Sequence, residues 1–304
     1  MRRLRVGLVG GGPWARRVHG PALAAHPGTE LAAVWTRRPE IAAALADGLG
    51  SRAAADLDEL LDAVDAVAFA VPPQVQGALA VRAAAAGKHL VCEKPLAADL
   101  TAARALAEAA RGLTSAVVLT LRYDPRIRAW LDGIPDGAGP DTVGAVRWLS
   151  GSLLGGQYAA SAWRAEHGAL LDLGPHAIDL LGAALGPVTG VGWAHHDEPD
   201  LWRLGLDHAG GAHSTVTLSL RLPVDPSEIE LTVFGGAGRH ELSGGVGDAT
   251  ACYARLLDDF VAAACREGPP VGLDIAHAVT LQEIVERALG LAGQPVMSGG
   301  AAGR

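Results

Sequence analysis

The chain has 304 residues, of which 49% are hydrophobic, 19% charged and 4% aromatic, and its formal net charge is −8. This length favours two domains over one core, and the composition is typical of a globular protein. An acidic chain without a Lys/Arg block argues against a nucleic-acid surface, and no window has the roughly 18 apolar residues of a membrane helix. Three cysteines without a CxxC pair indicate a reducing compartment, so we expect a cytoplasmic protein.

The chain opens with a short apolar strand at residues 4–9, followed directly by the segment GGGPWARRVHGPALAAH. This segment fits the pattern G-x-G-x-x-G/A. One glycine makes a tight turn, the second lets the backbone approach a pyrophosphate, and the third small residue lets helix pack on strand. Because an expected strand precedes it and an expected helix follows, we predict a dinucleotide site; the alternative is a merely tight turn. The predicted cofactor contacts in this loop are Gly10, Gly12, Pro13, Trp14 and Ala15.

Strands and helices alternate through the next hundred residues. We expect strands at residues 30–35, 66–71, 88–93 and 115–123, and helices at residues 39–48, 56–64, 75–87 and 100–112. This alternation predicts a parallel, doubly wound sheet with ligands at the carboxyl ends of its strands. Gly10, Thr36, Pro72 and Glu93 all fall at such ends. We therefore assign residues 1–122 to a Rossmann domain, with Pro72 and Glu93 among its cofactor contacts.

The end of the second strand bears on the choice of cofactor. An NAD-preferring site usually has Asp or Glu there, whereas this chain reads WTRRPE. Thr36 can hydrogen-bond a 2′-phosphate, and Arg37 or Arg38 can pair with it. We therefore predict that NADP is preferred. NAD is the alternative, in which the two arginines are solvated loop residues.

Beyond Tyr123 the pattern changes to period-two runs. A short helix at 125–134 is followed by expected strands at 143–154, 189–198, 200–208, 212–222, 228–236 and 238–244, and by helices at 250–268 and 274–293. Consecutive strands with short turns predict an antiparallel meander. We therefore assign residues 123–304 to an α+β substrate-binding domain with a mainly antiparallel open sheet. Such a sheet must cover one face by packing or by association with another copy.

An apolar-periodic helix within residues 167–186 carries three titratable side chains. Asp172, His176 and Asp179 recur at i, i+4 and i+7, which places them on or near one face. A carboxylate beside an imidazole fixes its tautomer and makes it a competent general acid or base. In the alternative, Asp172 caps the helix, Pro175 lies in its first turn, and His176 is a core histidine.

Lysine is rare in this chain, since only Lys88 and Lys94 occur among 25 basic residues. Lysine can lose its proton when buried or crowded by positive charge, whereas arginine stays charged. Lys94 is therefore a candidate for proton transfer. A GC-rich genome would make lysine scarce everywhere, so its rarity alone does not establish that role.

Taken together, these segments resemble the NAD(P)-dependent oxidoreductases of the Gfo/Idh/MocA family, named after glucose-fructose oxidoreductase, inositol dehydrogenase and a rhizopine-catabolism protein. The similarity covers nearly the whole chain. Its specific signals are the tripeptide E-K-P at residues 93–95 and the pattern D-x-G-x-H at residues 172–176. The resemblance implies that Glu93 and Lys94 approach the nicotinamide ribose and the substrate hydroxyl. It also implies dimer or tetramer contacts through the second domain's sheet.

The function implied is hydride transfer between a nicotinamide and a carbinol or keto carbon of a sugar, cyclitol or related polyol. The resemblance makes His176 the acid or base, with Lys94 assisting or substituting. The catalytic candidates are Lys94, Asp172 and His176. Weaker candidates for the substrate pocket, each of which could equally be packing or surface, are Arg122 and Tyr123 at the end of the last Rossmann strand and Trp163 and Arg164 before the His176 helix.

One departure from the family pattern affects the site. Family members often read T-P-x-x-x-H after the fourth strand, whereas this chain has Val71 and Gln76, which puts some cofactor or substrate contacts in doubt. Two other functions stay open. One is a non-catalytic, dinucleotide-binding regulator or sensor of the same fold. The other is a metal-binding hydrolase built on HHDE at residues 195–198, although adjacent strand residues point to opposite faces and are poorly placed to share an ion.

Overall fold

The structure is a computed structural model that describes residues 3–135, 137–155, 162–236, 238–245 and 247–294. Contacts between residues divide the chain into two units. The first contains the chain up to Tyr123 together with Asp248–Thr280, and the second contains Asp124–Gly247 together with the segment that starts at Leu281. The sequence predicts one domain from residue 123 onward, whereas helix α8 (Ala249–Ala264) groups with the first unit.

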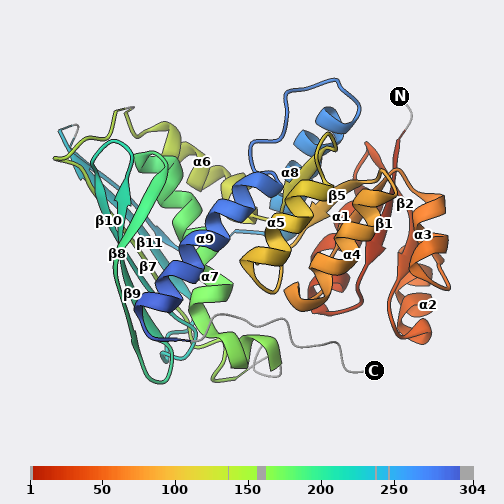
Figure 1. The fold of residues 1–304 in the computed structure, drawn as a ribbon, viewed down its shortest axis with the longest axis horizontal. Helices are drawn as coiled ribbons and strands as arrows, with labels where there is room; N and C mark the ends of the chain where they lie inside the picture. The colour runs from red at the N-terminus through yellow and green to blue at the C-terminus, as the bar shows by residue number, and fades with distance from the viewer. Residues whose placement is uncertain (1–2, 136, 156–161, 237, 246, 295–304) are drawn as a thin grey trace. The chain divides into compact units, whose positions relative to one another are not determined.

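The first unit is built on a six-stranded sheet with the order β3-β2-β1-β4-β5-β6 (Figure 1). Every neighbouring pair is parallel, as predicted. The strands are β1 (Leu4–Val9), β2 (Thr29–Trp35), β3 (Arg52–Ala53), β4 (Ala66–Phe69), β5 (His89–Cys92) and β6 (Ser115–Val117). The strand order reverses between β1 and β4, so the ligand edge of a doubly wound sheet is at the carboxyl ends of β1 and its neighbours.

Short local signals explain where the helices of this unit begin. The Asp56 and Asp99 side chains accept the backbone N–H of Glu59 and Ala102 and so cap α3 and α5. Proline stands in the first turn of α2 and α4, where its missing N–H has no cost. All four residues of β4 are buried, so both faces of the sheet are covered. The helices are α1 (Gly20–Ala25), α2 (Pro39–Gly48), α3 (Leu57–Ala63), α4 (Pro73–Ala85) and α5 (Leu100–Ala109).

The last strand of this sheet is shorter than predicted. β6 ends at Val117, and Thr120–Tyr123 forms a 3₁₀ turn instead of continuing the strand. The Leu119 N–H donates to the Val117 carbonyl at 2.8 Å, and the Arg122 N–H donates to the Leu119 carbonyl at 3.0 Å. Because these backbone bonds are local, the chain leaves the sheet. Arg122 and Tyr123 therefore do not end a strand, contrary to the prediction.

The second unit contains a six-stranded sheet with the order β12-β11-β7-β10-β9-β8. The strands are β7 (Val143–Leu149), β8 (Val188–Asp197), β9 (Leu201–His208), β10 (His213–Ser219), β11 (Glu228–Gly235) and β12 (Gly238–Gly244). All neighbouring pairs are antiparallel except β7 with β10, which is parallel. The mainly antiparallel sheet is thus confirmed. The meander holds for β8, β9 and β10 and for the pair β11 and β12, but β7 lies between β10 and β11 instead of beside β8. Alternation of apolar residues sets which face a strand buries, not which strand lies beside it.

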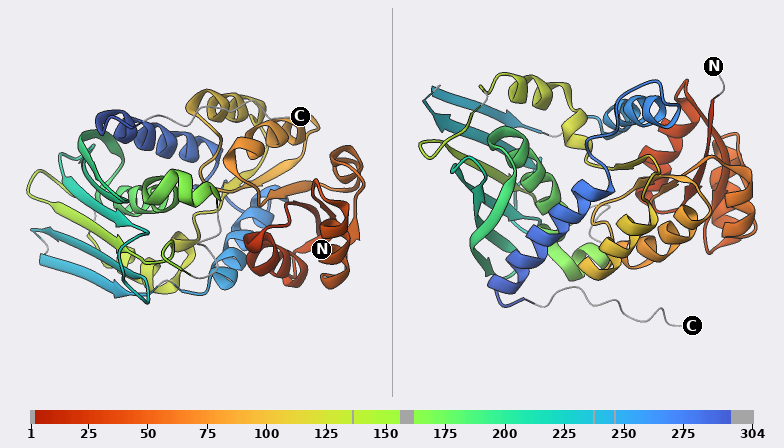
Figure 2. Two further views of the ribbon diagram at one scale, coloured as in Figure 1. Left: turned by 90° about the horizontal axis from the view of Figure 1, so that it is seen from below. Right: turned by 45° about the horizontal axis from the view of Figure 1, so that its top comes forward.

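Helix α7 (Ala162–Leu185) packs on one face of this second sheet (Figures 1 and 2). Packing is close at Gly144 on β7, where an added Cβ would lie 2.6 Å from Leu185 Cδ1. Among the described residues of the second unit, Figures 1 and 2 show no helix on the opposite face. Val143 and Phe234 are paired across β7 and β11 on that face and are exposed. The remaining helices are α6 (Pro125–Asp132) and α9 (Ile275–Leu291).

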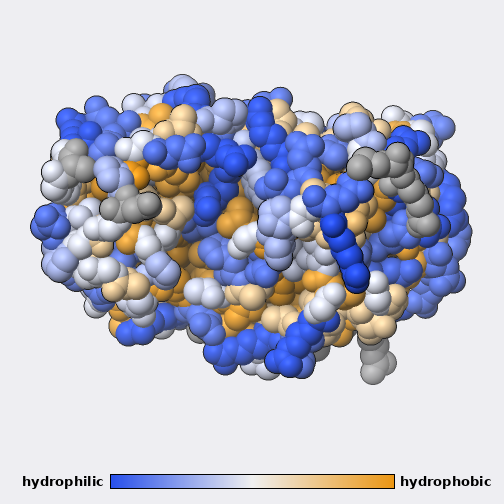
Figure 3. All heavy atoms as spheres, turned by 90° about the horizontal axis from the view of Figure 1, so that it is seen from above, coloured by the Kyte–Doolittle hydropathy of each residue, from blue (hydrophilic) through white to orange (hydrophobic). Residues whose placement is uncertain are grey.

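One face of the molecule is drawn in Figure 3. On the face drawn in Figure 3, hydrophilic residues predominate and hydrophobic residues appear between them. Within the part of the chain that the structure describes, no helix is both long enough and apolar enough to cross a membrane.

Candidate functional site

The glycine loop begins where β1 runs between β2 and β4. Gly10 has φ +130°, a conformation that L side chains rarely adopt, and its N–H donates to the Trp35 carbonyl at 3.0 Å. A Cβ at this position would lie only 2.3 Å from the Ala70 carbonyl oxygen. Gly10 therefore allows the chain to turn tightly between the ends of the two flanking strands.

Gly12 and Ala15 differ in what surrounds them. A Cβ at Gly12 would meet nothing within 4 Å, so no neighbouring protein atom requires glycine there. Ala15 is fully buried, as close helix packing requires. Pro13 and Trp14 start the helical segment, which continues as a π-helical turn over Ala15–His19. An open backbone at the start of a helix fits the approach of a pyrophosphate, so these residues suit a dinucleotide.

The end of β2 carries the residues predicted to select the cofactor. The Thr36 hydroxyl donates to the Arg38 carbonyl at 2.8 Å and accepts the Arg38 N–H at 3.1 Å. The Arg37 and Arg38 side chains are exposed. The turn thus presents two arginines and a threonine, with no carboxylate from residues 36–38.

The E-K-P loop follows β5, and its glutamate is anchored from several sides. Glu93 Oε1 lies 2.8 Å from His19 Nε2, and Glu93 Oε2 accepts the Lys94 N–H at 3.2 Å. The Gln76 side chain bonds the Glu93 backbone, accepting its N–H at 2.8 Å and donating to its carbonyl at 2.7 Å. Pro72, at the start of α4, is exposed at the end of the neighbouring strand. Lys94 therefore follows directly on a residue that is fixed at both backbone and side chain.

Sequence reasoning missed two residues beneath this loop. His19 is fully buried, and its ring packs against that of Tyr253 at a tilt of 40°, with centroids 4.3 Å apart. Burial raises the pKa of the Tyr253 hydroxyl, and the nearby Glu93 carboxylate raises it further. His19 lies one helical turn after Ala15, so the spacing of the glycine motif already placed it on the buried face of that helix.

In the second unit, α7 is kinked before it presents Asp172 and His176. Gly168 has φ 65° and ψ −163°, a combination open essentially only to glycine, and a Cβ there would lie 2.4 Å from Asp200 Oδ1. Asp172 and Pro175 lie inside the helix. The alternative in which Asp172 caps the helix and Pro175 lies in its first turn is therefore wrong.

A distant carboxylate caps the helical segment that follows this kink. Asp200, between β8 and β9, accepts the N–H of Ala169 at 2.9 Å and that of Leu220 at 3.0 Å. Burial raises the pKa of Asp200, and these two hydrogen bonds oppose the rise. An unpaired N–H at the start of a helix is thereby satisfied by a residue that precedes another strand.

Asp172 is held by Arg164, one of the residues predicted for the substrate pocket. Arg164 Nε donates to Asp172 Oδ2 at 2.7 Å, and the two side chains are 27% and 10% exposed. One turn along the helix, the His176 ring lies 6.0 Å from that of Trp148. Asp172 and His176 are both buried, and so is Asp179. The guanidinium partner of Asp172 is a feature that the i, i+4 spacing did not indicate.

The other three substrate candidates have different surroundings. Trp163 lies in the first segment of α7, with its ring 5.5 Å from that of His167 in an edge arrangement. Arg122 is half-buried in the 3₁₀ turn. Tyr123 is buried, and its carbonyl accepts a bond from Arg255 at 3.3 Å. For Tyr123 the surroundings favour packing.

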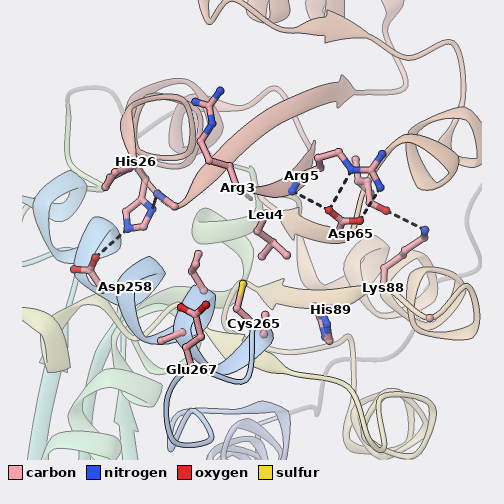
Figure 4. A pocket seen from close by; sticks show the side chains of 17 residues that line it. Arg3, Leu4, Arg5, His26, Asp65, Lys88, His89, Asp258, Cys265 and Glu267 are labelled. Atoms are coloured by element: carbon pink, nitrogen blue, oxygen red, sulfur yellow. Dashed lines mark hydrogen bonds and ion pairs between the residues drawn. The ribbon is translucent and has the colours of Figure 1, made fainter. Parts of the chain in front are cut away.

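A cavity of about 910 Å³ lies on the first unit at the amino-terminal ends of β1, β4 and β5, beside the end of α8 (Figure 4). Arg5 pairs with Asp65 at 2.7 Å, and Lys88 Nζ donates to the Val64 carbonyl at 2.9 Å. Ligands of doubly wound sheets bind at the opposite edge, where the carboxyl ends lie. This cavity is therefore not the candidate catalytic site.

The histidines of residues 195–198 are engaged with aromatic rings. His195 lies against Trp193 and His196 against Trp202, with centroids 5.6 and 4.5 Å apart. Asp197 pairs with Arg203. Within the described ranges, no group of three or more His, Cys, Asp or Glu side chains is placed to hold a metal ion. Nothing in this geometry supports the metal-hydrolase alternative.

Comparison with known proteins gives a consistent result. The family model for the GFO_IDH_MocA oxidoreductase family, with its NAD-binding Rossmann fold, matches residues 4–120. The rhizopine catabolism protein MocA of Rhizobium meliloti is 30% identical over 310 residues, which cover 95% of each chain. A dTDP-3,4-didehydro-2,6-dideoxy-alpha-D-glucose 3-reductase of Streptomyces violaceoruber is 36% identical over 194 residues. That alignment covers 61% of the present chain and only 56% of the reductase.

A solved structure agrees with the fold over nearly the full length. GenD2 from gentamicin A biosynthesis, in complex with NAD, has a TM-score of 0.85 at 26% identity. The match covers 96% of the present chain and 95% of GenD2. Both units therefore have counterparts in a chain that binds NAD.

Proposed function

Because the chain belongs to the Gfo/Idh/MocA family of oxidoreductases, we propose that it transfers a hydride between a nicotinamide and a carbinol or keto carbon of a sugar, cyclitol or related polyol. The observation that carries this proposal is the ligand edge of the parallel sheet. There, the open backbone of Gly12 and the anchored Glu93 follow two strands of one sheet. The relatives' names, a sugar 3-reductase and a rhizopine-catabolism protein, support a polyol substrate.

A bound nicotinamide would supply the hydride chemistry, and the protein would supply orientation and proton transfer. His176 is our first choice for moving the hydroxyl proton, because an imidazole titrates near neutral pH. Arg164 pairs with the Asp172 carboxylate, which lies one helical turn before His176. Lys94 is the second choice, since its amine can give up a proton where arginine cannot.

We also infer a preference for NADP. Arg37 and Arg38 are exposed at the end of β2, where they can pair with a 2′-phosphate, and residues 36–38 offer no carboxylate to a ribose 2′-OH. Titration of the purified protein with NADPH and NADH, followed by tryptophan quenching and energy transfer, tests this without a guessed substrate. We expect micromolar binding with NADPH preferred.

The outcomes of this titration separate the alternatives. Tighter binding of NADH than of NADPH would overturn the NADP preference but leave the proposed oxidoreductase function in place. Binding of neither cofactor would remove the basis of the proposed function. Cofactor binding without turnover in a broad polyol screen would favour the non-catalytic regulator.

We further infer that the protein is a homodimer or homotetramer in the cytoplasm. The face of the second sheet that carries Val143 and Phe234 leaves large apolar side chains exposed, which a second copy can cover. Light scattering of the purified protein and of Phe234→Glu measures this directly. A monomeric parent protein would contradict the inference.

A further inference from the structure

Gln76 on α4 makes a set of hydrogen bonds directed entirely at the backbone of the E-K-P loop. Its side chain is fully buried. Oε1 accepts the Glu93 N–H at 2.8 Å, while Nε2 donates to the Glu93 carbonyl at 2.7 Å and to the Leu96 carbonyl at 2.9 Å. Two of these bonds go to the same residue, so the carboxamide pairs with Glu93 as a neighbouring strand would.

The loop needs such a partner because its strand has ended. β5 stops at Cys92, and the polar backbone groups beyond it have left the ladder. Buried backbone N–H and C=O groups require hydrogen-bond partners. A carboxamide has two N–H donors and an acceptor oxygen, and both kinds of group are used here. The adjoining Gly77 brings helix and loop close, since a Cβ there would lie 3.1 Å from Ala97 Cβ.

We propose that Gln76 is the positioning residue of the E-K-P loop: it fixes the backbone of Glu93–Leu96 and thereby the place from which Glu93 and Lys94 reach cofactor and substrate. The functional part rests on the proposed function, whereas the positioning of the backbone does not. His19 completes the arrangement from α1's side by holding the Glu93 carboxylate. Backbone and side chain of one residue are thus fixed by two different helical segments.

Two substitutions at this position have opposite expected pH dependence. In Gln76→His, a neutral imidazole keeps one donor and one acceptor, but the protonated ring has two donors and no acceptor for the Glu93 N–H. In Gln76→Glu, the ionised carboxylate has no donor for the two carbonyls, whereas the protonated acid has one. As pH falls, the histidine variant therefore loses its hydrogen bond to the Glu93 N–H, whereas the glutamate variant regains a hydrogen bond to a loop carbonyl.

Other titratable groups near the loop do not confuse this comparison. Glu93, His19 on the glycine-loop helix, Tyr253 on α8 and Cys92 on β5 are the same in every variant. Comparing the exchange rate and the cofactor affinity of each variant with those of the parent at the same pH removes their contribution. Gln74→His and Gln74→Glu are matched controls, because Gln74 is exposed on the same helix two residues away.

The first measurement is amide hydrogen exchange of the loop peptide without cofactor, from pH 5.5 to 8.5, corrected for intrinsic rates. We expect at least about tenfold faster exchange across the loop peptide in Gln76→His at low pH and in Gln76→Glu at high pH, since each loses a buried bond that holds the loop. The Gln74 variants should match the parent. Parent-like protection in both Gln76 variants, or slopes of the same sign, would overturn the positioning role.

The second measurement is the affinity for NADPH and NADH of the same proteins at the same pH values. We expect affinity to weaken about tenfold wherever protection is lost, again from one buried hydrogen bond. Unchanged affinity and turnover despite lost protection would overturn the functional part. If the parent binds neither cofactor while the exchange slopes are opposite, the proposed function fails and the positioning of the backbone stands.

Discussion

The two units hold their candidate site residues in different ways. In the first unit, the residues follow the ends of adjacent parallel strands, and Glu93 is anchored by His19 and Gln76 from neighbouring helical segments. In the second unit, one kinked helix carries Asp172 and His176, and its start is capped by Asp200, 31 residues from the N–H that it accepts. The order of the parallel strands thus positions the candidate residues of the first unit. In the second unit, a single buried carboxylate, that of Asp200, holds the start of the helix that carries Asp172 and His176. The position of α7 should therefore be the more sensitive to one substitution far along the chain.

The largest expected effect tests which unit supplies the proton. His176→Gln should keep the affinity for NADPH within a few-fold, because this change does not alter the glycine loop. We expect kcat to fall by about 10²–10⁴ in His176→Gln, as for loss of a general acid or base. Lys94→Arg should lose more turnover than cofactor binding, since arginine stays charged. Steady-state kinetics on a substrate found by polyol screening measures both.

The chain offers a matched control for the lysine. Lys88→Arg changes the only other lysine, which lies at the amino-terminal edge of the sheet and donates to the Val64 carbonyl. This variant should keep parental kinetics. Full activity in Lys94→Arg would show that Lys94 does not transfer the proton. Full activity in His176→Gln would indicate that the acid or base is a residue of the first unit.

Next in size is the cap between distant parts of the second unit. Asp200→Ala leaves the Ala169 and Leu220 N–H groups without their acceptor, so we expect a loss of about 2–5 kcal/mol in the free energy of unfolding. The control is Asp248→Ala, which removes a local cap whose side chain accepts the Thr250 N–H at 2.9 Å. This local cap should cost only about 0.5–2 kcal/mol. Denaturant unfolding followed by fluorescence and circular dichroism gives both values, and equal losses would contradict the special weight of Asp200.

The same residue predicts a pH dependence of stability. Because the folded-state pKa of Asp200 is raised by burial, the folded protein binds this proton at a pH where the unfolded chain does not. Ionisation of Asp200 therefore disfavours folding above the raised pKa, and this penalty disappears as pH falls toward the ordinary aspartate value. The parent should gain stability relative to Asp200→Ala over that window. A gap that narrows on acidification would contradict the direction of the shift.

What the sequence could predict follows the same division between local and distant contacts. The strand at Leu4–Val9, the glycine turn and helix α2 depend on neighbouring residues, and each lies where the pattern placed it. The parallel sheet follows from their alternation. The candidate site of the first half could be predicted because its motifs follow strands whose carboxyl ends lie along one edge of a parallel sheet.

Most of the contacts that could not be predicted join residues far apart in sequence. The insertion of β7 between β10 and β11 depends on which strand edges pair. The alternation of apolar and polar residues along a strand does not indicate its neighbours. The cap by Asp200 joins residues on either side of a whole strand, so no spacing rule reveals it. The Arg164–Asp172 pair is nearer in sequence but spans the kink at Gly168, which breaks the helical period.

The smallest expected effect concerns how His19 is held in the first unit. In the described part of the chain, neither the Tyr253 hydroxyl nor His19 Nδ1 has a hydrogen-bond partner, although both are buried. If Tyr253 contacts His19 by ring packing alone, then Tyr253→Phe keeps this contact and removes an unsatisfied hydroxyl. We expect the free energy of unfolding to change by less than about 1 kcal/mol, with stabilisation the favoured sign.

Tyr253→Leu is the companion variant, because it removes the ring that packs against His19. It should lower the free energy of unfolding clearly more than the phenylalanine change does. A loss above about 2 kcal/mol in Tyr253→Phe would instead mean that an internal water joins the hydroxyl to His19, since such waters satisfy buried polar groups and are costly to remove. The anchor of Glu93 would then depend on a buried polar network, as α7 depends on Asp200. In that case the contrast between the two units would lie only in how far apart in sequence the partners are.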